Sequence, residues 1–215
     1  MKKKNLLASL SVIAAFVIWT ILVSVVDVKN MGPNASTVGF STLNGCVHKA
    51  MGVHMSLYAI TDWLGLVPLA TALGFAIFGF AQWIKRGSIL KVDRSILALG
   101  VFYIVVMSAY IFFETIVINY RPVLINGHLE ASYPSSTTML VMCVMPTALI
   151  QLKHRIEKIW LRKFVVFAIM IFIAFMVIGR AISGVHWITD IIGGALLSIG
   201  LVQAYLCCVN QTDEE

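Results

Sequence analysis

Six blocks of mostly apolar residues, each about as long as a membrane-spanning helix, limit what this chain can fold into. Crossing the hydrocarbon core of a bilayer takes about 20 residues of α-helix. A soluble domain breaks such blocks with charged residues, which make up about a quarter of its sequence, whereas only 12% of this chain is charged. We therefore predict an all-α integral membrane protein, a six-transmembrane-helix bundle in a single membrane domain of residues 1–215. The predicted spans are residues 6–26, 63–83, 96–118, 135–152, 164–182 and 186–208.

Positive charge is distributed unevenly between the two sides of these spans. Twelve of the 16 Lys and Arg residues lie in the first four residues and in the loops 84–95 and 153–163. Cytoplasmic loops are enriched in Lys and Arg, so we expect cytoplasmic N- and C-termini in a multi-pass plasma-membrane protein. The first block is longer than the core of a signal peptide, and we interpret it as a retained span. The net charge of +6 then indicates a bilayer rather than nucleic acid as the partner. An interfacial helix is expected around residues 48–58.

Three short polar motifs lie at the outward-facing ends of the predicted spans. Segments distant in the sequence thus meet at one face of the membrane, where we expect the functional site. The motifs are Arg121-Pro122 after the third span, Pro134-Ser135-Ser136-Thr137 at the start of the fourth, and Arg180 to Asp190 between the fifth and the sixth.

The third motif carries the strongest chemical signal. His186 and Asp190 are four residues apart, so they share one face of a helix. A carboxylate in an apolar stretch needs a partner, and one that binds a ring nitrogen of His186 leaves the other free as a nucleophile or base. The guanidinium fork of Arg180 matches phosphate oxygens. The alternative is that Arg180 extends to the membrane surface, His186 is an interfacial histidine and Asp190 pairs with another group.

The other two motifs are compatible with an anion site and also with simpler roles. A Pro-Ser sequence before an apolar run is typical of a helix start, where Ser135 acts as a cap. The free N–H groups of that helix start, together with the Ser135 and Ser136 hydroxyls, can also bind phosphate. Arg121 is either a second phosphate ligand or one of the many arginines found near membrane surfaces.

In this order and on these spans, the motifs resemble the type-2 phosphatidic acid phosphatase superfamily of membrane lipid phosphatases. The family pattern is a Lys and Arg-Pro motif, then Pro-Ser-Gly/Ser-His, then Ser/Gly-Arg-x5-His-x3-Asp. The third motif is complete here, from Gly179 to Asp190, and Arg121-Pro122 matches half of the first. The resemblance covers a phosphatase-like core of about residues 64–202.

This resemblance implies hydrolysis of a membrane lipid phosphate at the extracytoplasmic face, without a metal or other cofactor. His186 would attack phosphorus to form a phosphohistidine, and Asp190 would orient His186. Arg121, Arg180, Ser135 and Ser136 would bind the phosphoryl oxygens.

Two positions depart from the family pattern. The second-motif histidine, which serves as the general acid, is replaced by Thr137, and the first-motif lysine is replaced by Glu114. An ionised Glu114 close to phosphate would repel it. Without an acid, a lipid alkoxide leaves slowly, whereas phosphate is a better leaving group because its second pKa is near 6. The hypothesis is therefore a diphosphate substrate, such as undecaprenyl diphosphate, or a slow enzyme.

Three alternatives stay open at this stage. His128, in the loop of Arg121, can replace the missing acid. The chain can instead be a catalytically impaired homologue that binds lipid phosphate. A small lipid transporter fits less well, because Glu114 and Asp190 are the only acidic residues within the spans and both lie near their outer ends.

Overall fold

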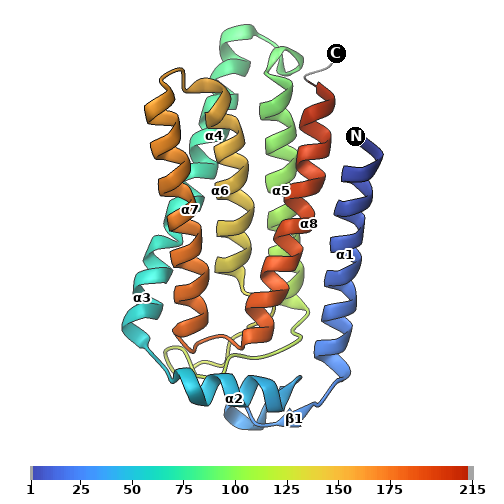
Figure 1. Cartoon of the computed structure of the whole chain (residues 1–215), viewed down its shortest axis with the longest axis vertical. Coiled ribbons are helices and arrows are strands. Elements are labelled where there is room, and N and C mark those ends of the chain that lie inside the picture. Colours follow the sequence, from blue (N-terminus) through green and yellow to red (C-terminus); the bar gives the residue numbers. More distant parts are fainter. Residues whose placement is uncertain (1, 213–215) are drawn as a thin grey trace.

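The computed structural model describes residues 2–212, and the side chains of all of these except residues 2–5, 154 and 210–212. Long helices run side by side and form a bundle (Figure 1). Six helical spans are long and apolar enough to cross a membrane, which confirms the predicted six-helix architecture. The helices are α1 (Lys2–Val25), α2 (Ser41–Met51), α3 (Met55–Leu64), α4 (Leu66–Arg86), α5 (Arg94–Thr115), α6 (Ser136–Arg155), α7 (Ile159–Ile182) and α8 (Ile188–Thr212), with α3 and α4 together forming the second span.

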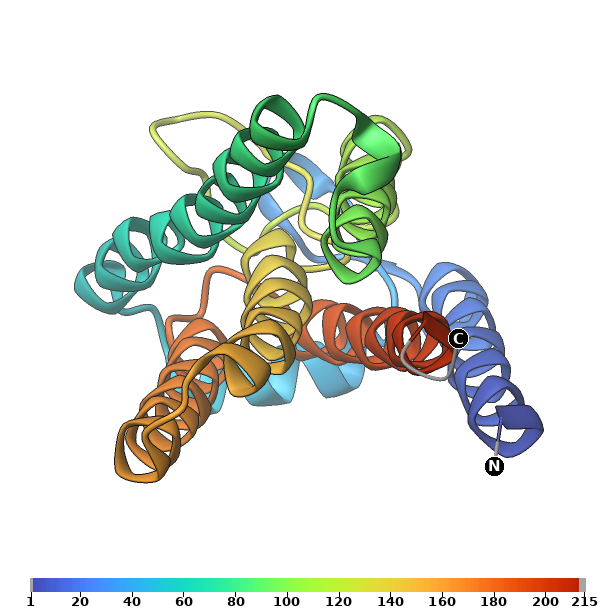
Figure 2. The ribbon, with the colours of Figure 1, turned by 90° about the horizontal axis from the view of Figure 1, so that it is seen from above.

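Helix α6 lies at the centre of the bundle, with α4, α5, α7 and α8 packed around it (Figure 2). It is also the least apolar span, with a mean hydropathy of 1.2 against 2.7 for α7. Protein rather than lipid surrounds α6, so its polar side chains find partners inside the bundle. The Thr147 hydroxyl, for example, donates to the Cys143 carbonyl at 2.8 Å, and Gln151 Nε2 donates to the Tyr205 hydroxyl at 2.7 Å.

Helix α1 packs along α8 at the edge of the bundle. The Ser9 hydroxyl on α1 donates to the Gly200 carbonyl on α8 at 2.9 Å. A Cβ atom added at Gly200 would lie 2.7 Å from Cγ1 of Ile13, so this close approach requires glycine. Contacts of this small-residue type hold helices together where lipid supplies no hydrophobic driving force.

One end of the bundle is closed by polar connections, and we call it the site end. Helix α2 lies across it, beside the two-residue strands β1 (Lys29–Asn30) and β2 (Thr37–Val38) (Figure 1). Asn44 fixes α2 there, because its Nδ2 donates to Gly39 O at 2.7 Å and to Thr189 Oγ1 at 3.0 Å. The helix expected around residues 48–58 is thus placed wrongly: α2 ends before Gly52, whose φ of 71° interrupts the helix, and Met55 already begins the second span.

The turn between α7 and α8 also depends on glycine. Gly184 has a φ of 69°, and a Cβ there would lie 2.0 Å from the Gly52 carbonyl oxygen. The Ser183 carbonyl accepts a hydrogen bond from His54 N at 2.9 Å. The segment that carries His186 is therefore held against the loop between α2 and α3.

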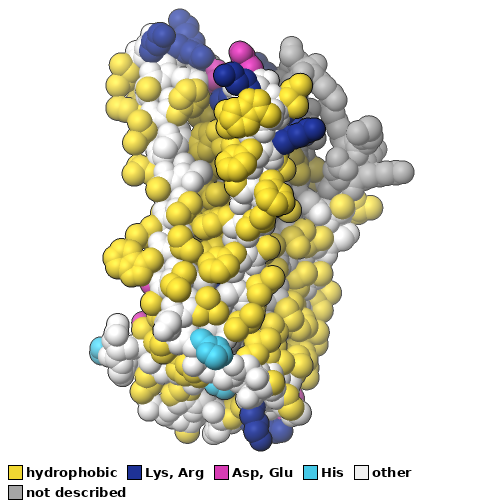
Figure 3. Space-filling model, turned by 60° about the vertical axis from the view of Figure 1, so that its left-hand side comes forward, with side chains coloured by type: hydrophobic (Ala, Val, Ile, Leu, Met, Phe, Trp, Pro, Cys, Tyr) yellow, Lys and Arg dark blue, Asp and Glu magenta, His cyan; other side chains and the backbone are white. Residues whose placement is uncertain are grey.

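The surface separates into a hydrophobic band and two polar ends. Figure 3 shows apolar side chains along the length of the bundle, a cluster of Lys and Arg at one end, and histidines near the other. Helix α1 begins and α8 ends at the Lys- and Arg-rich end, opposite the site end. This is the surface of a bundle whose middle contacts lipid.

Candidate functional site

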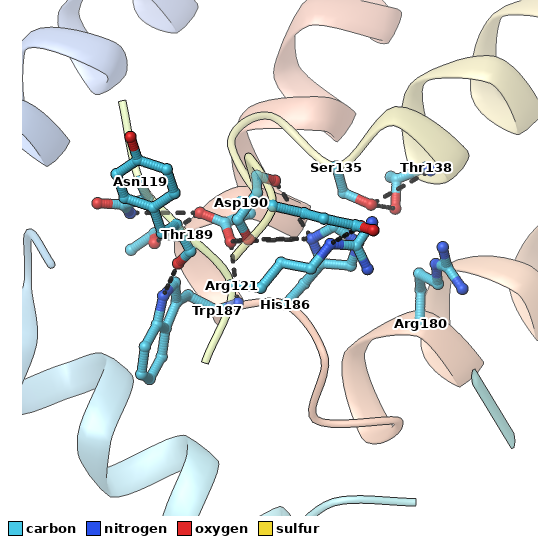
Figure 4. A network of polar contacts seen from close by, with 12 residues as sticks. Asn119, Arg121, Ser135, Thr138, Arg180, His186, Trp187, Thr189 and Asp190 are labelled. Atoms are coloured by element: carbon cyan, nitrogen blue, oxygen red, sulfur yellow. Dashed lines mark hydrogen bonds and ion pairs between the residues drawn. The ribbon is translucent and has the colours of Figure 1, made fainter. Parts of the chain in front are cut away.

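The residues predicted from the three motifs gather at the site end (Figure 4). Two connecting segments, residues 116–135 and 183–187, meet there. The first folds back on itself, because Arg121 N donates to Glu130 O at 3.1 Å and Ser132 N donates to Asn119 O at 2.9 Å. This hairpin places Arg121, Glu130 and Ser132 beside the turn that carries His186.

His186 is 4% exposed and has one ring nitrogen bound and one free. Nδ1 lies 3.2 Å from both the carbonyl and the hydroxyl oxygen of Ser132. Nε2 is buried and has no hydrogen-bond partner among the described residues. Burial, and then the positive charges of Arg121 and Arg180, hold the pKa of His186 well below its ordinary value of 6.5. The imidazole is therefore neutral at pH 7, with Nδ1–H donated to Ser132 O and a lone pair available on Nε2.

Asp190 is fully buried and accepts hydrogen bonds from four residues in two stretches of the chain, 119–132 and 187–189. Its Oδ2 accepts from the Ser132 hydroxyl and from Trp187 N, the latter at 2.9 Å. Its Oδ1 accepts from Asn119 Nδ2 at 3.3 Å and from the Thr189 hydroxyl at 3.5 Å. These donors provide the partners that a carboxylate needs away from water.

The pairing of His186 with Asp190 is less direct than the sequence spacing predicts. Nδ1 lies 3.9 Å from Oδ2, which is within ion-pair range but too long for a hydrogen bond. The Ser132 hydroxyl contacts both side chains and connects them. Sequence reasoning missed Ser132 and Asn119, because neither belongs to a motif and both reach the site only through the hairpin.

Arg121 is 7% exposed and faces a carboxylate on the opposite arm of the hairpin. Its Nε lies 3.2 Å from Glu130 Oε2. Its Nη1 is buried and has no hydrogen-bond partner among the described residues. The guanidinium also lies over the Tyr58 ring, with Cζ 5.8 Å from the ring centroid. Arg121 thus keeps an unused donor, although Glu130 balances its charge.

Arg180 lies near the site, but its guanidinium group is bound to side chains of α3. It donates to Thr61 Oγ1 at 3.2 Å and to Asp62 Oδ1 at 3.1 Å, and it lies 4.7 Å from the centroid of the Tyr58 ring on α3. In Figure 4 it stands apart from His186. Arg121 lines the same cavity as His186, which is described below, whereas the contacts of Arg180 join α7 to α3.

The first residues of α6 have different roles. Ser135 is the N-cap, since its hydroxyl accepts from Thr138 N at 3.5 Å and from Thr138 Oγ1 at 3.1 Å. Ser136 lines the cavity described next, whereas Thr137 is buried and does not line it. The positive end of the α6 dipole therefore reaches the cavity at Ser136.

A cavity of about 260 Å³ joins these groups. It is large enough for a phosphoryl group, and its wall combines cationic, acidic and aromatic side chains. His128, at the tip of the hairpin, is exposed and lies outside it. Among the described residues, no group of three or more His, Cys, Asp or Glu side chains is arranged to hold a metal ion. The lining residues are Tyr110, Phe113, Glu114, Arg121, Glu130, Ala131, Ser132, Tyr133, Pro134, Ser136, Met139 and His186.

The chain is similar to a known protein family and to a solved structure. The PAP2 superfamily model matches residues 109–214, which include Arg121, His186 and Asp190. The fold is similar to the crystal structure of a transmembrane PAP2-type phosphatidylglycerolphosphate phosphatase from Bacillus subtilis, with a TM-score of 0.63 and 19% identity over 96% of this chain and 97% of that one. No curated protein sequence matches the chain significantly. Residues 109–214 therefore belong to the PAP2 superfamily.

Proposed function

We propose that this protein hydrolyses a lipid phosphate or diphosphate at the extracytoplasmic face of the membrane, through a phosphohistidine at His186. One observation carries the proposal. Nε2 of His186 is buried and unpartnered among the described residues, and it shares a cavity with Arg121, whose Nη1 is also unpartnered. A buried lone pair beside a buried unused cation is costly unless a ligand completes the site.

The chemistry follows from the neutral imidazole. Nε2 attacks phosphorus, a bond from Nε2 to phosphorus forms, and the bond to the leaving oxygen breaks. Nδ1–H stays hydrogen-bonded to Ser132, while the nearby Asp190 carboxylate stabilises the positive charge that develops on the ring. Water then attacks phosphorus, which releases phosphate and restores His186.

Positive groups around the cavity would hold the phosphoryl oxygens. Arg121 offers Nη1, and the start of α6 offers N–H groups and the Ser136 hydroxyl. Arg180 would join them by exchanging its bond to Asp62, whose side chain is 56% exposed and can turn to solvent. Such donors stabilise the charge of the transition state more than that of the bound substrate.

The membrane setting supports a lipid substrate on the extracytoplasmic side. The cavity lies at one end of a bundle whose middle is covered by apolar side chains (Figure 3). Twelve of the 16 Lys and Arg residues belong to the opposite end. Because positive loops stay in the cytoplasm, the site end would face outward, within reach of lipid headgroups.

The test is phosphate release by the purified protein in detergent micelles that contain a radiolabelled dialkylglycerol phosphate or a polyprenyl diphosphate. We expect free phosphate, together with a label on the protein that is stable in alkali and lost in acid, as for a phosphohistidine. Binding of either lipid without any release of phosphate would contradict the proposed hydrolysis.

Binding without turnover is the second candidate, and the charges of the site favour it. Both arginines already face carboxylates, Arg121 at 3.2 Å from Glu130 and Arg180 at 3.1 Å from Asp62. Thr137, at the position of the family acid, does not line the cavity. A protein that binds a lipid phosphate tightly and leaves it intact would fit these observations.

Replacing Ser132 with alanine is expected to lower turnover about 10–100-fold, the range found when a group that orients a metal-binding histidine is lost. The hydroxyl connects Nδ1 of His186 to Oδ2 of Asp190. Steady-state phosphate release measures the effect. Ser198→Ala is the matched control, because Ser198 is a buried serine that bonds the Gly194 carbonyl on α8 and does not line the cavity. Equal losses in the two variants would refute the assigned role.

A further inference from the structure

Helix α5 ends at the cavity and contributes an acidic side chain to its wall. Tyr110 and Glu114, which are one turn apart, both line the cavity, as does Phe113. Glu114 occupies the position where the family pattern has lysine. The structure therefore places a carboxyl group where an ionised form would repel the proposed substrate.

Three other side chains of the cavity that can carry a proton are already engaged. His186 is the neutral nucleophile, and Glu130 pairs with Arg121. The Tyr133 hydroxyl is bonded to Thr20 Oγ1 at 2.7 Å. Glu114, by contrast, forms no hydrogen bond or ion pair with any residue that the structure describes. Its carboxyl group is free to exchange a proton with a ligand.

Glu114 also lies on the side from which a lipid would leave. Its neighbours at the end of α5, Ile111, Phe112 and Ile116, are 57%, 51% and 48% exposed. Exposed apolar side chains on a membrane helix face lipid. The hydrocarbon part of a lipid phosphate would therefore leave the cavity past Glu114, and its ester oxygen would lie between phosphorus and this residue.

We propose that Glu114 is the general acid of the reaction and replaces the histidine that the second motif lacks. This inference rests on the proposed phosphatase function. In this role Glu114 holds a proton when the substrate binds and gives it to the leaving oxygen.

The proton balance is complete for both steps. In the first step the bond from Nε2 of His186 to phosphorus forms, the bond from phosphorus to the lipid oxygen breaks, and the Glu114 proton passes to that oxygen. In the second step the water oxygen bonds to phosphorus, the bond between phosphorus and Nε2 of His186 breaks, and the Glu114 carboxylate takes up the proton that water loses. The enzyme returns to its starting state without another reactant.

This assignment changes the expected substrate range. A protein without an acid would need a good leaving group, such as the phosphate of a polyprenyl diphosphate. A protein with Glu114 as the acid hydrolyses a dialkylglycerol monophosphate as well. The preference for diphosphates should then appear only when Glu114 is removed.

The test is Glu114→Gln assayed on three probes: a dialkylglycerol monophosphate, a polyprenyl diphosphate and para-nitrophenyl phosphate. Loss of the acid should lower kcat/KM about 10²–10⁴-fold for the dialkylglycerol monophosphate. For the other two probes, whose leaving groups need little protonation, we expect a loss of less than about tenfold. Glu114→Asp should recover part of the lost activity.

Glu130→Gln is the matched control, because Glu130 is the second carboxyl group of the cavity but pairs with Arg121. Its effect should be similar for all three probes. Faster hydrolysis by Glu114→Gln would show repulsion by an ionised carboxylate, and an equal loss on all three probes would show a structural role; either result overturns the assignment. Absence of phosphate release from wild-type protein would instead refute the proposed function itself.

Discussion

Replacing His186 with alanine is expected to abolish phosphate release, with a loss of at least about 10⁴-fold, as for other enzymes that lose a catalytic nucleophile or its base. No other described residue brings an unpartnered buried nitrogen lone pair into the cavity. Release of phosphate and labelling of the protein should disappear together, because both depend on the bond between Nε2 and phosphorus. Phosphate release from a dialkylglycerol phosphate measures the first, and acid-labile radiolabel on the protein measures the second.

The control is His128→Ala, which removes an exposed histidine of the same end that lies outside the cavity. We expect its turnover to stay within about twofold of wild type, as for most surface substitutions. A large loss in His128→Ala would identify that residue as the acid instead of Glu114. If His186→Ala still released phosphate at more than a small fraction of the wild-type rate, the phosphohistidine mechanism would be wrong.

The result also separates hydrolysis from binding. Arg121 and the start of α6 remain in His186→Ala, so the variant should still bind a lipid phosphate. An inactive variant with intact binding, beside an active wild type, identifies an enzyme. A wild type that binds and never releases phosphate identifies a binding protein with the charges of a former active site.

The six spans are predictable from the sequence because each has to be apolar over the thickness of the bilayer. The least apolar span also has a physical explanation. Helix α6 has the lowest mean hydropathy of the six, 1.2, because protein surrounds it. The prediction of a helix around residues 48–58 is wrong because the position of α2 does not depend on apolar length. It depends on the hydrogen bonds of Asn44 to Gly39 and Thr189. No periodic pattern records a contact between residues 145 positions apart.

The candidate site shows the same division. Arg121, His186 and Asp190 stand in spaced motifs at span ends, so their meeting at one end follows from the topology. Ser132, in contrast, contacts His186 because the segment 119–132 folds into a hairpin. Likewise, the pairing of Arg180 with Asp62 depends on how α3 packs against α7. Sequence spacing predicts which elements meet, but not which side chains bind one another.

Replacing Asp190 with asparagine is expected to lower turnover about 10³–10⁴-fold, the size of effect found when an amide replaces the carboxylate that orients a catalytic histidine. Asparagine has the same shape but no negative charge to balance the phosphorylated imidazole. Its amide nitrogen must also take the place of one oxygen. The fixed Trp187 N–H bonds Oδ2, so the nitrogen should take the Oδ1 position and face two donors, Asn119 Nδ2 and the Thr189 hydroxyl.

The lost and opposed hydrogen bonds should lower the free energy of unfolding by about 1–3 kcal/mol, so turnover has to be measured well below the melting temperature of the variant. Asp62→Asn is the matched control, since it removes a carboxylate from the same end that pairs with Arg180. It leaves the bonds of Asp190 intact, and release of Arg180 toward the cavity should keep its kcat within about tenfold of wild type. If Asp190→Asn retained more than about a tenth of wild-type turnover, the carboxylate would be a structural acceptor for Ser132 and Trp187, and His186 would not need its charge.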